Sequence, residues 1–103
     1  MSESRHYVAV DLGAESGRVM LATCSQDSLE IEELHRFPNG PIEQDGSLRW
    51  DFPGLMAQIK TGLKKAFALG KTITSIGVDT WGVDFALLDR RGGHRGRIDR
   101  GLA

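Results

Sequence analysis

The sequence has little of what marks secreted, membrane-spanning or strongly charged proteins. Cys24 is the single cysteine, so no disulfide can form within the chain, and we expect an inert thiol and a cytoplasmic location. No apolar run approaches the ~20 residues needed to cross a bilayer, and the polar first residues lack the apolar core of a signal peptide. A net charge of −1 gives no overall attraction to nucleic acid or membranes.

The remaining composition is that of one small domain. The chain has 103 residues, of which 40% are hydrophobic and 26% charged, values typical of a soluble globular protein. A domain of this length buries only roughly 65% of the surface of its unfolded chain. Its fold is therefore sensitive to any strand or helix that is missing.

The first half of the chain is rich in strand patterns. Alternating and β-branched apolar residues predict strands at Tyr7–Val10, Arg18–Cys24 and Leu29–Phe37. A glycine-containing turn joins the first two into an antiparallel hairpin, and the third slips in its alternation, which indicates a bulge. Turn signals at Pro38–Pro41 and Asp45–Gly46 then flank a polar loop, and Ser47–Trp50 is a short extended segment.

A helix is predicted next, with Asp51 as its cap, Pro53 in its first turn and Gly70 at its end. Its apolar row recurs every four residues, at Leu55, Ile59, Leu63 and Phe67.

The remaining segments complete an α/β fold class with a mixed sheet. The near-continuous apolar run Ile73–Val78 predicts a strand after a crossover helix, buried on both faces. Asp79–Gly82 is typical of a turn and Val83–Leu88 of another strand. Residues 90–103 hold five arginines and four glycines with few apolar residues, and we expect them to be disordered.

A first candidate site follows the first strand. Asp11 could hold a hydrated Mg²⁺, which usually takes one or two carboxylates together with phosphates and waters. The turn after it offers small residues that let amides approach phosphate oxygens, a hydroxyl and a positive charge, at Gly13, Ala14, Ser16, Gly17 and Arg18. The alternative is an ordinary hairpin turn that uses glycine. Neither a Walker A loop nor a dinucleotide GxGxxG pattern is present.

A second candidate site lies within Gly77–Phe85, where a buried strand is expected to end. Trp81 could pack on the apolar face of a sugar, Gly82 lets a ligand approach the backbone, and Asp84 could accept hydroxyl hydrogen bonds. The alternative is a β-turn with a core tryptophan. Asp79 and Asp84 fit structural or sugar-binding roles better than that of a catalytic base.

Together these segments resemble the opening of rhamnulokinases, a family of FGGY carbohydrate kinases. The similarity is carried, in order, by VAVDLGAESGRVMLA, HRFPNG, DGSLRWD and SIGVDTWGVDFALLD. It implies a ribonuclease-H-like, actin-like fold of two lobes, with residues 1–89 forming part of the first. It also implies the use of ATP and Mg²⁺ and the phosphorylation of L-rhamnulose at its 1-hydroxyl.

The resemblance assigns roles to particular residues. It places the ATP-phosphate hairpin at Ala14, Glu15, Ser16, Gly17 and Arg18, a sugar contact at Gly82, and the metal ligand at Asp11. Glu15 stands where the family usually has serine, which puts an anion beside the phosphates. The family's catalytic aspartate has no counterpart in this sequence, so no catalytic residue is assigned.

Several functions stay open at this point. Residues 90–103 replace the family's tyrosine-arginine-aspartate stretch, and we interpret them as disordered or out of frame. We therefore expect an enzyme fragment that is inactive alone. The alternatives are a fragment of another FGGY sugar kinase, a non-catalytic nucleotide- or sugar-binding module, and a basic-tailed interaction protein.

Overall fold

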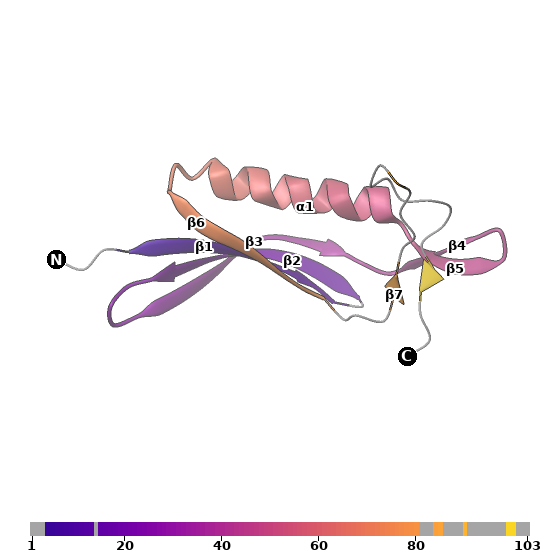
Figure 1. Ribbon diagram of the computed structural model, residues 1–103, viewed down its shortest axis with the longest axis horizontal. Coiled ribbons are helices and arrows are strands. Elements are labelled where there is room, and N and C mark those ends of the chain that lie inside the picture. Colours follow the sequence, from indigo (N-terminus) through magenta and orange to yellow (C-terminus); the bar gives the residue numbers. More distant parts are fainter. Residues whose placement is uncertain (1–3, 14, 81–83, 86–89, 91–98, 101–103) are drawn as a thin grey trace.

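The main sheet of the computed structural model has four strands in the order β3–β2–β1–β6 (Figure 1). The structure describes residues 4–13, 15–80, 84–85, 90 and 99–100. Antiparallel pairing joins β1 (Arg5–Leu12), β2 (Ser16–Cys24) and β3 (Leu29–Pro38). The fourth strand, β6 (Ile73–Thr80), runs parallel to β1. The predicted α/β class with a mixed sheet is confirmed.

The predicted irregularity in the third strand is a β-bulge. Val19 pairs with His35, whereas Met20 pairs with Glu33, so Leu34 is the extra residue. Ile31, before the bulge, is 62% exposed, whereas Phe37, which an uninterrupted alternation would put on the same face as Ile31, is 3% exposed. The bulge therefore moves the apolar residues of β3 from one face of the sheet to the other.

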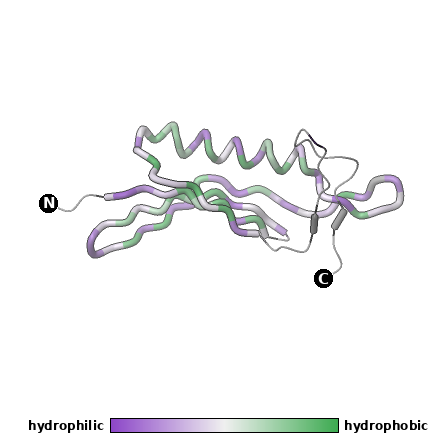
Figure 2. Tube along the Cα trace, in the orientation of Figure 1, coloured by the Kyte–Doolittle hydropathy of each residue, from purple (hydrophilic) through white to green (hydrophobic). Residues whose placement is uncertain are grey.

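The helix α1 (Phe52–Phe67) covers one face of the sheet, over β1, β2 and β3 (Figures 1 and 2). Its start is as predicted, because the Asp51 carboxylate accepts a hydrogen bond of 3.1 Å from the Gly54 amide. Gly70, at φ 73°, takes the left-handed conformation just beyond the end of the helix. No helix in the described part of the chain is long and apolar enough to span a membrane.

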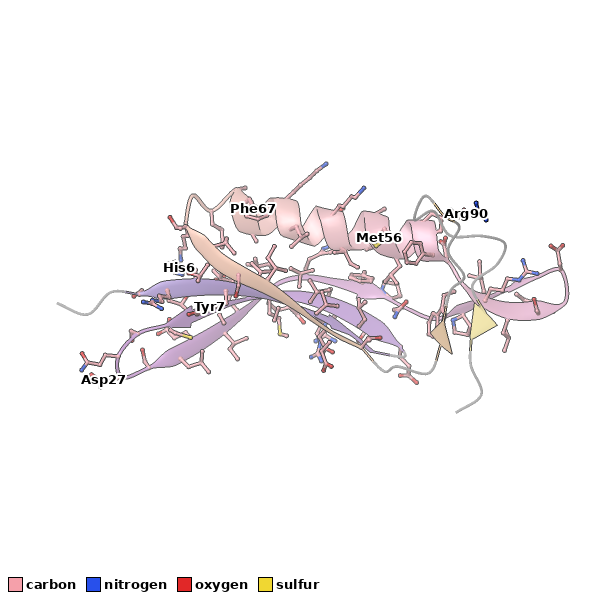
Figure 3. The ribbon with its side chains drawn as sticks, viewed as in Figure 1. His6, Tyr7, Asp27, Met56, Phe67 and Arg90 are labelled. Atoms are coloured by element: carbon pink, nitrogen blue, oxygen red, sulfur yellow. The ribbon has the colours of Figure 1, made fainter. Side chains whose placement is uncertain are left out.

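The core lies between α1 and the central strands. Its fully buried members are Val8, Val10, Val19, Leu21 and Ala66. Gly62 is also buried, and Ile59 and Leu63 pack at the edge of the core. The prediction that Phe67 belongs to the buried row is wrong, since its side chain is 53% exposed (Figure 3). The helix meets the sheet through its small residues, which lets the two layers approach closely.

Polar contacts also tie α1 to β3. The Oε1 atom of Gln58 lies 2.7 Å from Nε2 of His35, and Nζ of Lys65 lies 3.0 Å from Nδ1 of the same ring. An amide oxygen can only accept and an ammonium can only donate, so Nε2 carries the proton and Nδ1 accepts. These two bonds join α1 to β3.

The predicted polar loop is wrong, because Pro41–Gln44 is a strand that forms a hairpin with Ser47–Trp50, whose extended conformation is confirmed. Strands β4 (Pro41–Gln44) and β5 (Ser47–Trp50) pair around Asp45 and Gly46, whose φ angles are 51° and 79°. Two successive left-handed residues define the tight turn that matches the twist of a hairpin. The Asp-Gly pair therefore indicated a turn between two strands. The first of these strands was not predicted because it begins with a proline.

Two short strands extend this hairpin into a second sheet in the order β4–β5–β8–β7. They are β7 (Asp84–Phe85) and β8 (Asp99–Arg100). The other residues of the predicted strand Val83–Leu88 lie outside the described residues. Within the tail predicted to be disordered, Asp99 pairs with Arg49 of β5, whereas residues 91–98 and 101–103 lie outside the described residues.

Strand β6 differs from its prediction in two ways. Asp79 and Thr80 extend it, although the sequence predicted a turn there. Its predicted burial on both faces is also wrong, because Ile76 is 44% exposed and Val78 is 64% exposed. A parallel strand is buried on both faces only where helices cover both. Here β6 is an edge strand, and α1 lies over β1 to β3 instead.

We expect the isolated chain to self-associate through β6, because a long edge strand with exposed apolar side chains is a template for pairing. A Val78→Lys variant should shift sedimentation-velocity profiles toward the monomer at high protein concentration. Thr61→Lys, which adds the same charge on the exposed face of α1, is the matched control. Equal association of both variants and the wild-type chain would place the contact elsewhere.

Candidate functional site

The turn between β1 and β2 is held by hydrogen bonds from inside and from outside. Within it, the Gly13 amide donates to the Ser16 carbonyl at 3.0 Å. From outside, the backbone amide of Asn39 donates to the Glu15 carbonyl at 3.0 Å, and Nδ2 of Asn39 donates to the Gly13 carbonyl at 2.7 Å. Asn39 directly follows β3, so the far end of a third strand supports the turn.

Of the residues predicted to bind phosphate, Glu15 is exposed at the turn, and Ser16, Gly17 and Arg18 begin β2. Ala14 lies outside the described residues. The turn is therefore formed where the sequence predicted it, and the exposed carboxylate of Glu15 stands at its tip. Their contacts with phosphate stay a prediction.

Gly17 has a packing reason to be glycine. It is buried opposite Phe37, and a Cβ atom built on it would lie 2.2 Å from Cζ of that ring. Such a distance is shorter than any real carbon contact, so the ring occupies the space of the missing side chain. The small size of Gly17 thus seats β3 against the base of the hairpin.

Asp11 lies beside two charged residues. The pairing of the strands places it opposite Arg18 of β2 on one side and Asp79 of β6 on the other. Nη2 of Arg18 donates to Oδ2 of Asp11 at 2.5 Å, with both side chains about one-third exposed. An exposed ion pair of this kind contributes only about 0–1 kcal/mol to stability. Its main effect is to orient the Asp11 carboxylate.

The two carboxylates face the side of the sheet away from α1. Val8 and Val10 of β1 are buried under the helix, so the alternate residues Ala9 and Asp11 point to the opposite face. An open depression of about 450 Å³ lies on this side, lined by Ala9, Val10, Asp11, Met20, Gly77, Val78 and Asp79. Two carboxylates and a depression therefore coincide at one end of the sheet.

This donor set fits Mg²⁺. The described residues contain no group of three or more His, Cys, Asp or Glu that could enclose a metal ion. Mg²⁺ does not need such a cage, because it retains waters and takes one or two carboxylates plus the phosphates of its nucleotide. Asp11 and Asp79 supply that number, and Asp79 was not predicted as a ligand.

The predicted sugar-binding residues cannot be placed as a group. Trp81 and Gly82 lie outside the described residues. The backbone of Asp84 is in β7, where it pairs with Arg100 in the second sheet rather than extending β6. The structure thus brings together Asp11, Arg18 and Asp79, and their relation to the sugar residues stays a prediction.

Comparison with known proteins gives the class that this chain resembles, the sugar kinases. A rhamnulokinase of Enterobacter sp. (strain 638) is 54% identical over 94 residues, which cover 89% of this chain. The resemblance inferred from the motifs is confirmed. The same match covers 19% of that protein, so this chain spans about a fifth of the length of its relative. No family model matches the sequence.

Proposed function

We propose that this chain is the opening part of an ATP-dependent sugar kinase that phosphorylates L-rhamnulose at its 1-hydroxyl. The observation that carries the proposal is the 54% identity to a rhamnulokinase over 89% of the chain. The pairing of Asp11 with Asp79 across β1 and β6 supports it, since it creates a place for the metal of a nucleotide. We propose a cytoplasmic location, which a chain with a single cysteine favours.

The order of the strands supports the ribonuclease-H-like part of the proposal. Three antiparallel strands are followed, through a helix, by a fourth strand parallel to the first. The second β-sheet, with β7 and β8, begins beyond the ends of β3 and β6. We propose that residues 1–89 belong to the first lobe of such a kinase. Within residues 90–103, Asp99 and Arg100 form β8, which pairs with β5 and β7.

Each residue of the site has a role in this proposal. When bound, ATP supplies the phosphoryl group and Mg²⁺ neutralises its charge. Asp11 and Asp79 would hold the hydrated ion, and Arg18 keeps Asp11 oriented. The amides of residues 14–18 would lie against the phosphates, and Trp81, Gly82 and Asp84 would contact the sugar. None of these residues is proposed as the base for the sugar hydroxyl.

The proposal predicts magnesium-dependent ATP binding without phosphoryl transfer by the isolated chain. Titration with MgATP, followed by amide NMR, should shift Glu15, Ser16 and Arg18, and Asp11→Ala should abolish the dependence on Mg²⁺. Glu15→Ser should tighten binding several-fold, because it removes an anion from the phosphates. No L-rhamnulose phosphate should form, because a positioned base alone contributes about 10²–10⁴-fold.

Two outcomes would contradict the proposal in different ways. Identical spectra with and without MgATP would show that these residues do not form a nucleotide site. Turnover that saturates with both substrates and is lost in Asp11→Ala would show that the chain is a complete catalyst. Binding without transfer is also what a non-catalytic nucleotide-binding module would give, so L-rhamnulose-dependent shifts are needed to support the kinase assignment.

A further inference from the structure

We propose that Asn39 is the positioning residue of the phosphate turn, a role that rests on the proposed function. Asn39 contacts the turn from β3 and holds it through two separate donors. Its backbone amide reaches the Glu15 carbonyl at 3.0 Å, and its side-chain amide reaches the Gly13 carbonyl at 2.7 Å. The two carbonyls lie on either side of residue 14, so the tip of the turn is held at both ends.

The contact requires a side-chain donor, which the amide of Asn39 supplies. A carbonyl oxygen can only accept, so the group of Asn39 that faces Gly13 must be the Nδ2 donor. An ionised aspartate of the same shape has acceptors alone and would repel that carbonyl. Alanine would leave the carbonyl without this partner, although the backbone bond to Glu15 could persist.

The consequence for phosphate binding follows from the geometry of the peptide bond. In a trans peptide, the carbonyl and the following N–H point in opposite directions. Because Asn39 draws the Glu15 carbonyl toward β3, the Ser16 N–H is turned away from β3. The hydrogen bond from Asn39 to Glu15 therefore sets the direction of the Ser16 N–H before a ligand binds. Preorganised donors bind anions more strongly than mobile ones.

The neighbouring contact makes the support rigid. Phe37, two residues before Asn39, is 3% exposed and fills the space above Gly17. The base of the hairpin is thus fixed by packing and its tip by hydrogen bonds, both from one short segment. This explains why the end of β3 matters to a site that the sequence places between β1 and β2.

The test compares Asn39→Ala and Asn39→Asp with the wild-type chain and with Gly40→Ala. A Cβ atom at Gly40 would have no neighbour within 4 Å, so this variant is the matched control. We expect both Asn39 variants to bind MgATP about tenfold more weakly. Hydrogen exchange of the Gly13 amide, which donates to the Ser16 carbonyl within the turn, should accelerate in both, whereas exchange at Val8 and Val10 in the core should stay as in wild type.

The outcomes separate this role from the proposed function. Wild-type affinity in Asn39→Ala overturns the positioning role, even if Asn39→Asp binds weakly, because added charge then explains the loss. Faster exchange throughout the core would show a merely structural role and would also overturn it. If the wild-type chain itself does not bind MgATP, the proposed function fails, and the positioning role is judged on turn exchange alone, with unchanged exchange overturning it.

Discussion

Gly17→Val is expected to lower the free energy of unfolding by about 3 kcal/mol or more, the upper range for overpacking a core. By strand propensity alone, valine would be favoured over glycine in β2. A loss of stability is expected instead, because the new Cβ atom would lie 2.2 Å from the ring of Phe37 and overlap it. A domain of this length has a total free energy of unfolding of about 5–15 kcal/mol. Urea denaturation followed by circular dichroism measures the loss.

A second substitution identifies the cause. Phe37→Ala alone should cost about 3–5 kcal/mol, since it empties a buried site. If the clash is responsible, the double variant Gly17→Val/Phe37→Ala should be more stable than the sum of the two losses implies. Gly40→Ala should be close to neutral. Additive losses would mean that the ring does not occupy the space beside Gly17, and the packing explanation would fail.

This result bears on the proposed site as well. Gly17 belongs to the segment that the family resemblance assigns to phosphate binding. Loss of nucleotide binding in Gly17→Val would follow from unfolding alone, so it would not identify a ligand contact. Ser16 and Arg18, which are only partly buried, are the positions at which binding can be tested without the same effect.

Gly62→Ala is expected to destabilise the chain by about 1–3 kcal/mol, again against local propensity. Inside an exposed helix, this change stabilises by about 1 kcal/mol. At Gly62 the added Cβ would lie 2.3 Å from Cγ2 of Val19, which is fully buried. The close contact between α1 and β2 leaves no room for the methyl group. The midpoint of urea unfolding measures the effect.

The controls for Gly62 come from the same helix and its partner strand. Thr61→Ala, on the exposed face, should change stability by no more than about 0.5 kcal/mol. Val19→Ala should recover part of the loss when it is combined with Gly62→Ala. A higher urea midpoint in Gly62→Ala would mean that helix propensity dominates and that the two layers are further apart.

Local patterns predicted most of the main sheet and the start of the helix. The cap at Asp51 and the bulge in β3 were recognised because each depends on residues that are close in sequence. The burial of β6 was not predictable. An apolar run such as Ile76 to Val78 indicates that the strand can be covered on both faces, but it does not show whether other elements cover it. Phe67 was wrongly predicted to be buried for a related reason. The spacing of large apolar residues does not show that the helix packs on the sheet through a small residue such as Gly62.

In the candidate site too, contacts between distant segments were harder to predict than contacts between residues close in sequence. Asp11 and Arg18 were both predicted to belong to the site, but their ion pair was not predicted, although it joins residues that are close in sequence across the predicted hairpin. Asn39 was missed because its partner Gly13 is 26 residues away, and only the arrangement of β3 beside β2 brings them together. Asp79 was read as part of a turn, and only the parallel register of β6 shows that it adjoins Asp11.

The parallel register of β6 also determines when the site can form during folding. Each of the pairs β1–β2 and β2–β3 joins segments that are consecutive in the sequence. Strands β1 and β6 are neighbours in the sheet, but in the sequence the other strands of that sheet and the whole helix lie between them. Contacts between distant segments close larger loops and form late. A growing chain emerges amino terminus first, so its hairpin can close while Asp79 is still unsynthesised. The second carboxylate is therefore added last, and the proposed metal site is complete only when β6 pairs with β1.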